Sequence, residues 1–273
     1  MSSRLKELGK RPLIMGILNV TPDSFSDGGR FLNPRKAIEH AVSMIRAGAD
    51  IIDIGGESSR PGSEGVSIEE ELERIIPIIK KVRDNSDIFI SVDTVNSEVA
   101  RAALEAGADM INDISALRID PEVAEAAAKR NAYLILMHMR GTPEDMQENT
   151  EYDDIIGEIS SFLAGAAQKA IEAGVKKDKI IIDPGIGFGK SAEGNFTLLK
   201  NLDRFLKLGY PIMVGASRKS FIGKVLELDV DNRLEGSLAA ACYAVLNGAD
   251  IVRVHDVAET KRALTIIEKI VAA

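Results

Sequence analysis

Residues 34–55, which read PRKAIEHAVSMIRAGADIIDIG, contain one complete passage from a helix to a strand. The segment 34–47 carries apolar side chains at helical spacing, and Gly48 suits the left-handed conformation that ends a helix. The apolar run at 50–55 is short and rich in isoleucine, which is typical of a strand buried on both faces of a parallel sheet. The segment therefore predicts a helix that leads directly into a parallel strand.

This passage is repeated along the chain. The fragment Gly-Ala-Asp at 48–50 occurs again at 107–109 and at 248–250, each time between a helical pattern and an apolar run. The apolar runs predict strands at 13–20, 50–55, 88–94, 109–114, 133–138, 180–184, 212–216 and 251–255. The longer amphipathic segments predict helices at 34–47, 68–84, 96–106, 121–130, 152–173, 195–208, 233–246 and 257–271.

Strict alternation of strands and helices predicts an α/β fold, and specifically a (β/α)8 TIM barrel. The chain has 273 residues, a length typical of one such barrel. No stretch is rich enough in proline, glycine or serine to serve as an interdomain linker, so we expect residues 1–273 to form a single domain. An open, doubly wound sheet of parallel strands is the alternative.

The composition argues against several classes of partner. The formal net charge is −8, so we expect neither nucleic acid nor an anionic membrane surface as a partner. No apolar run approaches the roughly 18 residues that span a bilayer, and the polar N-terminal residues fit no signal peptide. The lone cysteine, Cys242, is consistent with a reducing compartment. We therefore expect a soluble cytoplasmic protein.

Polar side chains occur where the predicted strands end. In chain order these are Asn19, Asp53, Asp93, Asn112 with Asp113, His138, Asp183, the run Ser217-Arg218-Lys219, Arg253 and His255. Buried polar groups are costly unless they are paired, so such a set must bond internally or face a ligand. Long loops at 21–33, 56–67 and 140–151 follow the same strand ends. Both features predict a binding site at the carboxyl end of the barrel.

The charges in this set indicate a type of ligand. Asp93, Asn112 and Asp183 complement a flat heterocycle that carries N–H donors. The cations that could bind a phosphate or carboxylate are Arg60, Arg218, Lys219 and Arg253. In an acidic chain, this clustering suggests an uncharged ring joined to an anionic group.

Eight segments resemble the signatures of the dihydropteroate synthase family. They are 15–29 (MGILNVTPDSFSDGG), 48–62 (GADIIDIGGESSRPG), 91–94 (SVDT), 111–114 (INDI), 136–141 (LMHMRG), 183–190 (DPGIGFGK), 215–223 (GASRKSFIG) and 252–255 (VRVH). They occur in order from the first predicted strand to the last. One departure is Ser59, where the family usually has threonine, and we expect from it modest changes in loop packing or amine affinity.

The resemblance implies a transferase of folate biosynthesis. Such an enzyme displaces pyrophosphate from 6-hydroxymethyl-7,8-dihydropterin pyrophosphate with p-aminobenzoate, and it uses Mg²⁺. The resemblance also suggests a homodimer formed through helices far from the strand ends.

The resemblance further implies roles for individual residues. The pterin ring would be held by Asp93, Asn112, Asp183 and Lys219, with Met137 and Ile114 near its faces and Gly215 in the substrate-binding set. The pyrophosphate would contact Asn19, Arg253 and His255, with Asn19 helping to place Mg²⁺. The aromatic amine pocket would be shaped by Ser59, Arg60, Pro61, Phe188, Lys219 and Ser220. Asp27 would order the mobile loops.

Several alternatives share part of this pattern. A pterin-dependent methyltransferase would have the same barrel and the same ring-binding residues, but would not need the pyrophosphate cations. A synthase could use a ribosylated or phosphorylated aniline, and a pterin-binding protein could lack activity. Lys219 could also be the Schiff-base lysine of an aldolase. Pyrophosphate release on mixing the two substrates separates the synthase from the methyltransferase and from the inactive pterin-binding protein.

Overall fold

The computed structural model describes residues 4–21, 34–57, 66–142 and 144–273. Its strands are β1 (Leu13–Asn19), β2 (Ile51–Gly55), β3 (Phe89–Asp93), β4 (Met110–Asp113), β5 (Tyr133–Met137), β6 (Ile180–Asp183), β7 (Met213–Val214) and β8 (Ile251–Val254). All paired strands are parallel, in the order β6-β5-β4-β3-β2-β1-β8-β7. A parallel bridge between Ile182 and Ile212 joins the two ends of this order. The sheet is therefore closed, which confirms the predicted barrel and excludes the open sheet.

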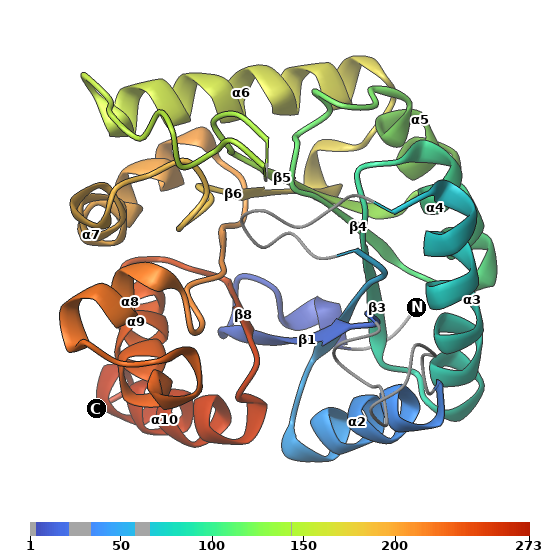
Figure 1. Ribbon diagram of the computed structural model, residues 1–273, viewed down its shortest axis with the longest axis horizontal. Helices are drawn as coiled ribbons and strands as arrows, with labels where there is room; N and C mark the ends of the chain where they lie inside the picture. The colour runs from blue at the N-terminus through green and yellow to red at the C-terminus, as the bar shows by residue number, and fades with distance from the viewer. Residues whose placement is uncertain (1–3, 22–33, 58–65, 143) are drawn as a thin grey trace.

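Helices form an outer ring around the strands, as Figure 1 shows. They are α2 (Pro34–Ala47), α3 (Ile68–Asn85), α4 (Ser97–Ala106), α5 (Glu122–Arg130), α6 (Ile155–Glu172), α7 (Ala192–Lys200), α8 (Ser220–Leu226), α9 (Leu234–Leu246) and α10 (Val257–Val271). Short 3-10 helices are η1 (Arg4–Glu7), η2 (Lys177–Lys179), η3 (Leu202–Leu208) and η4 (Val230–Asn232). In the described residues, no helix is both long enough and apolar enough to cross a membrane.

The prediction of a single helix at 195–208 was wrong, because the structure has two elements there, α7 and η3. The Ser191 hydroxyl accepts the N–H of Gly194 and so begins α7 earlier than predicted. Asn201 ends α7 with φ −112° and ψ 26°, outside the helical range, and η3 follows as a tighter 3-10 helix. The turn that begins at Ser220 is a separate helix, α8.

The three Gly-Ala-Asp joints have the same structure. Gly48, Gly107 and Gly248 adopt φ values of +102°, +115° and +97°, the left-handed conformation expected of a residue that ends a helix. The aspartate of each joint accepts a backbone N–H from a neighbouring strand: Asp50 from Ile14, Asp109 from Ile90, and Asp250 from Ile212. Each joint therefore ends a helix and anchors the start of the adjacent strand.

The interior of the barrel changes character from one end to the other. Alternate residues of a barrel strand point inward. Near the amino ends these residues form a buried apolar cluster, made of Leu13, Met15, Ile51, Phe89, Met110, Ile135, Ile181, Met213 and Ile251, with Leu5 beneath it. Two residues further along, the inward positions include Asp53, Ser91, Asn112, Met137, Asp183, Gly215 and Arg253. The strands thus carry a packed floor and, above it, a polar layer.

Candidate active site

The polar layer contains a charged cluster centred on Arg253 of β8. The Arg253 Nε donates to Asp53 Oδ2 at 2.6 Å, and its Nη2 donates to Asp93 Oδ2 at 2.7 Å. The Asn112 amide donates to the same Asp53 oxygen at 3.1 Å. Side chains from β2, β3, β4 and β8 therefore meet in one network.

Two buried acceptor atoms of this network have unused hydrogen-bonding capacity. Among the described residues, Asp53 Oδ1 and Asn112 Oδ1 have no hydrogen-bond partner, although both lie in side chains that are almost fully buried. A buried acceptor without a partner is costly, so such atoms commonly accept a hydrogen bond from water or a ligand. Both are suited to N–H donors of a heterocycle.

Burial and neighbouring charges act in opposite directions on the pKa values of this cluster. Burial raises the pKa of Asp93 to about 7, and Arg253 opposes that rise while Asp53 adds to it. Burial also works to lower the pKa of Arg253, but Asp53 and Asp93 outweigh it and the pKa is raised. Arg253 therefore stays charged, while the charge of Asp93 responds to whatever binds beside it.

A second charged pair lies beside this network, where β6 and β7 end. Asp183 Oδ1 accepts the N–H of Gly185 at 2.7 Å. Burial raises the pKa of Asp183, and Lys219 opposes this rise. Burial lowers the pKa of Lys219 to about 7, while Asp183 works against this effect. Lys219 also donates to the carbonyl of Ile186.

An apolar cluster lies beside this pair. It consists of Met137, Met139, Met146 and Phe188, with the partly buried Ile114 packed against it. The Nζ of Lys219 lies 4.2 Å from the centroid of the Phe188 ring, which is a cation–π distance. The cluster offers flat, polarisable surface next to the carboxylates, as a planar ring requires.

The turn after β7 joins the end of β8. The Ser217 hydroxyl lies 3.0 Å from His255 Nδ1, and the same oxygen accepts the His255 N–H at 3.2 Å. Gly215 lies against Arg253, because a Cβ at this glycine would lie 3.7 Å from the arginine Cβ. Ser220 is exposed at the start of α8.

Arg218 does not supply the ligand cation that the sequence suggested. Its Nε and Nη2 donate to Asp256 at 3.0 Å and 2.6 Å, and its Nη1 lies 3.6 Å from Asp231. Its backbone is left-handed, with φ +58°, and its N–H is bonded to the Ser237 hydroxyl. Arg218 therefore holds the turn that presents Lys219.

Two further polar residues at strand ends have structural partners. The Asp113 carboxylate accepts the N–H groups of Ser115 and Leu117 and so holds a tight turn. The His138 ring packs edge-on against Phe162 of α6, with 4.8 Å between the centroids. Both side chains are directed toward the surrounding elements rather than into the charged network described above.

Some predicted residues lie outside the described part of the chain. These are Asp27, Ser59, Arg60 and Pro61. Sequence reasoning placed Asp53 at a strand end but gave it no role in the site, whereas the structure makes it the partner of both Arg253 and Asn112. The sequence did contain a signal for this role. Alternate side chains of a strand point the same way, and Asp53 lies two residues after the inward-facing Ile51.

The described residues fit Mg²⁺ only as a metal shared with a substrate. Among them, no group of three or more histidine, cysteine, aspartate or glutamate side chains is arranged to hold a metal ion. Asn19, half-buried at the end of β1, offers a single amide oxygen. Mg²⁺ commonly takes one or two protein ligands and completes its shell with water and substrate phosphates, so this donor set is suitable.

The chain is similar to known proteins along nearly its full length. The family model described as pterin binding enzyme matches residues 15–255. A dihydropteroate synthase from a Synechocystis species is 55% identical over 254 residues, which cover 93% of this chain and 88% of the relative. The chain belongs to the dihydropteroate synthase family.

Solved structures agree with this assignment. The Yersinia pestis dihydropteroate synthase in complex with a sulfonamide drug has a TM-score of 0.92 and 45% identity, covering 97% of this chain and 96% of that one. The Xanthomonas albilineans dihydropteroate synthase with 4-aminobenzoic acid has a TM-score of 0.91 and 45% identity, covering 96% and 94%. The resemblance carried by the eight sequence segments is therefore confirmed, and the methyltransferase alternative is not favoured.

Proposed function

We propose that this chain joins 6-hydroxymethyl-7,8-dihydropterin pyrophosphate to p-aminobenzoate and releases pyrophosphate, as a dihydropteroate synthase. The observation that carries the proposal is the polar layer, in which Asp53, Asp93, Asn112 and Arg253 form one hydrogen-bonded network beside Asp183 and Lys219. It is supported by the family and by the Xanthomonas albilineans relative, whose structure contains 4-aminobenzoic acid.

In this proposal the carboxylates serve the pterin ring. Asn112 Oδ1, which has no hydrogen-bond partner among the described residues, would accept a ring N–H, and Lys219 would stabilise a negative charge on Asp183. Cleavage of the C–O bond to the pyrophosphate would leave positive charge delocalised over the ring. Asp93 and Asp183 would stabilise that charge in a site where water is scarce, which is where electrostatic stabilisation is strongest. Met137 and Ile114 would pack near the ring faces.

The departing pyrophosphate would be bound by Arg253 and His255. Among the described residues, Arg253 donates through Nε and Nη2, so Nη1 can serve an anion. Ser217 fixes the orientation of the His255 ring through its contact with Nδ1. Asn19 would hold Mg²⁺ together with the phosphate oxygens, and the metal would neutralise charge on the leaving group.

The aromatic amine would bind next to Phe188 and Lys219, with Ser220 completing that part of the site, and Gly215 would be a further substrate-binding residue. The Lys219 pKa of about 7 makes its charge sensitive to its neighbours, and both Asp183 and an amine carboxylate would favour the charged form. Ser59, Arg60, Pro61 and Asp27 are assigned to the amine pocket and the loops by the resemblance alone.

Pyrophosphate release tests the proposal directly. Purified protein is mixed with both substrates and Mg²⁺, and pyrophosphate is measured with an enzyme-coupled assay, omitting each component in turn. We expect release only when the pterin and the amine are both present. Release that does not depend on the amine, or no release at all, contradicts the proposal. A panel of anilines, including ribosylated and phosphorylated ones, then identifies the preferred amine.

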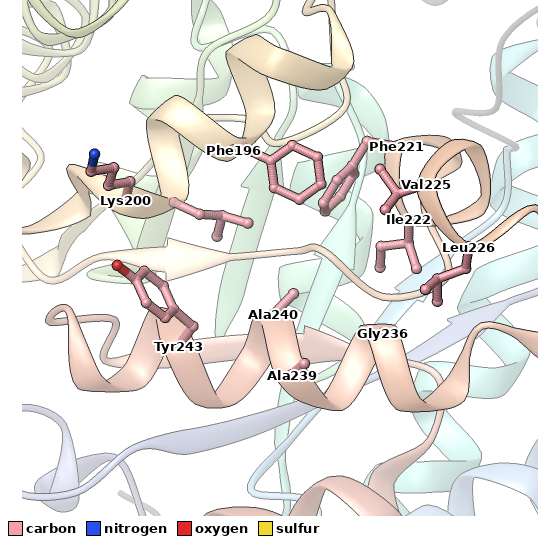
Figure 2. Close-up of a pocket in the computed structure, with 11 residues that line it drawn as sticks. Phe196, Lys200, Phe221, Ile222, Val225, Leu226, Gly236, Ala239, Ala240 and Tyr243 are labelled. Atoms are coloured by element: carbon pink, nitrogen blue, oxygen red, sulfur yellow. The ribbon is translucent and has the colours of Figure 1, made fainter.

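We further infer that residues 1–273 form a single domain and that the protein is a cytoplasmic homodimer. An open apolar groove of about 470 Å³ lies between α7, α8 and α9, and Figure 2 shows its lining side chains. Phe196, Val225 and Tyr243 in this groove are 45%, 60% and 45% exposed. An exposed apolar patch of this kind commonly marks a protein interface, and the family resemblance indicates a second copy as the occupant.

A further inference from the structure

A buried lysine lies under the glycine-rich loop that follows β6. The Nζ of Lys190 lies 2.7 Å from the carbonyl oxygen of Phe188, 3.0 Å from His138 Nδ1 and 3.3 Å from the carbonyl oxygen of His138. Lys190 is only 3% exposed. Burial lowers the pKa of Lys190 well below its ordinary value, and Asp183 opposes this effect. In the ammonium form the group has three N–H donors, and these three acceptors match them. Burial, together with Lys190, lowers the pKa of His138 to about 2, and the neutral ring can accept at Nδ1.

The loop at residues 185–190 is anchored at each of its carbonyl groups. The donors to residues 185 through 190 are, in order, the Phe188 N–H, Lys219, Gln147, Lys190, Tyr152 and Asn195. Lys190 also bonds His138, the residue that follows β5. It therefore ties the loop after β6 to the end of the neighbouring strand.

The glycines of this loop allow its backbone to lie close to neighbouring residues. Gly185 has φ +71°, and a Cβ there would lie 1.9 Å from the His138 carbonyl oxygen. Gly187 has φ +87°, and a Cβ there would lie 2.7 Å from Lys219 Cδ. The loop backbone is thus pressed against both neighbours, and Phe188 follows directly after the second of these glycines. A small movement of the Phe188 carbonyl would displace its ring and disturb Lys219.

We propose that Lys190 is a positioning residue for the aromatic amine, because its buried amino group holds the Phe188 carbonyl against the end of β5 and so fixes the Phe188 ring. The inference rests on the proposed function, which places the amine beside that ring. Asp93 and Asn112, which are assigned to the pterin, are held by other contacts, through Arg253 and Asp53. Burial raises the pKa of Asp183, and Lys219 opposes this more strongly than Lys190 does.

The effect of Lys190 should therefore fall mainly on the amine. We expect Lys190→Met to raise the KM for p-aminobenzoate about ten-fold or more, and the KM for the pterin pyrophosphate by less than about three-fold. Lys190→Arg keeps N–H donors on a long side chain at this position, and should return the amine KM to within about three-fold of the wild-type value. Steady-state kinetics with each substrate varied in turn measures both. Lys207→Met, at an exposed lysine, is the matched control.

Several results would overturn the inference. They are an equal rise in both KM values, no change in the amine KM, or an arginine variant as impaired as the methionine variant. If Lys190→Met does not fold by circular dichroism, Lys190→Gln replaces it, and loss of folding in both assigns Lys190 to barrel stability and sinks the proposal. A wild-type enzyme that releases no pyrophosphate contradicts the proposed function instead, so the two failures are distinguishable.

Discussion

Arg253 organises the acidic side of the site. It bonds both Asp53 and Asp93, so one cation offsets two carboxylates that would otherwise repel each other in a buried place. Burial raises the pKa of Asp93 to about 7 in spite of Arg253, which leaves that group close to half-ionised near neutral pH. Positive charge that develops on a neighbouring ring would favour the ionised form. Asp93 is therefore suited to respond to charge during the reaction.

Replacing Asp93 tests this role. Asp93→Asn keeps the shape of the side chain but removes its charge, and we expect kcat to fall by about 10²- to 10³-fold, as for other electrostatic groups in active sites. Turnover is measured by pyrophosphate release at saturating substrates. Asp203→Asn, at an exposed position of η3, should leave kcat unchanged. A wild-type rate in Asp93→Asn would rule out stabilisation of a ring cation by this carboxylate.

Residue type and strand position predict only part of this chemistry. The inward positions of Asp183 and Arg253 follow from the two-residue period of their strands. The ion pair of Arg218 with Asp256 does not, because the direction of the Arg218 side chain depends on a left-handed backbone and on a residue 38 positions away. Asp113 is adjacent to the inward-facing Asn112 and so points the opposite way, into its own turn. Turn geometry and pairing at long range are what the sequence pattern leaves open.

The loop after β6 shows how an element can be specified by its glycines. We expect Gly185→Ala to destabilise the protein by about 3 kcal/mol or more, because the new Cβ would overlap the His138 carbonyl at a left-handed backbone position. Gly165 is exposed within α6, and a Cβ there would have no neighbouring atom within 4 Å, so Gly165→Ala should stabilise by about 0.5–1 kcal/mol. Urea unfolding of both variants measures the difference. Equal effects of the two substitutions would contradict this account of the loop.

Helix α3 contains a buried carboxyl group in its first turn. Burial raises the pKa of Glu71 to about 7, and a hydrogen bond with Thr94 opposes the rise. A carboxyl with a raised pKa in the folded state holds its proton more tightly there than in the unfolded chain. The folded state therefore loses stability as the pH rises from the ordinary value of 4.5 toward about 7.

Glu71→Gln should remove this loss. The free energy of unfolding of the variant minus that of the wild type should be larger at pH 8 than at pH 5, by up to about 3 kcal/mol. Urea unfolding at the two pH values measures it. Glu69→Gln, which changes an exposed residue of the same turn, should show no such pH difference. If both variants respond to pH alike, Glu71 is not the group responsible.

The barrel as a unit was predictable from the sequence because its signals are local and repeated. Each Gly-Ala-Asp joint marks a helix end and a strand start, and the structure places all three as expected. The split of the segment 195–208 was less accessible, since it depends on the caps at Ser191 and Asn201. Hydrophobic periodicity could not predict the exposed groove between α7, α8 and α9, because it identifies the apolar face of a helix but not what covers that face.

Self-association through this groove is testable with a charge. Val225→Asp would place a carboxylate on a side chain that is 60% exposed in the groove, and burial of that charge in an interface is costly. We expect a monomer by light scattering where the wild-type protein is a dimer. Ile266→Asp changes a side chain that is 61% exposed on α10, outside the groove, and should leave the dimer intact. A monomeric wild-type protein, or a dimeric Val225→Asp variant, contradicts the assignment.

The apolar floor of the barrel also determines from which side ligands reach the polar layer. Phe89, Met110 and their neighbours fill the interior at the amino ends of the strands, and Leu5 of η1 packs beneath them. A packed core of this kind offers no passage for a solute. Ligands of the polar layer therefore reach it from the carboxyl ends of the strands and not through the floor. The departing diphosphate and the incoming amine would approach and leave on that same side of the barrel.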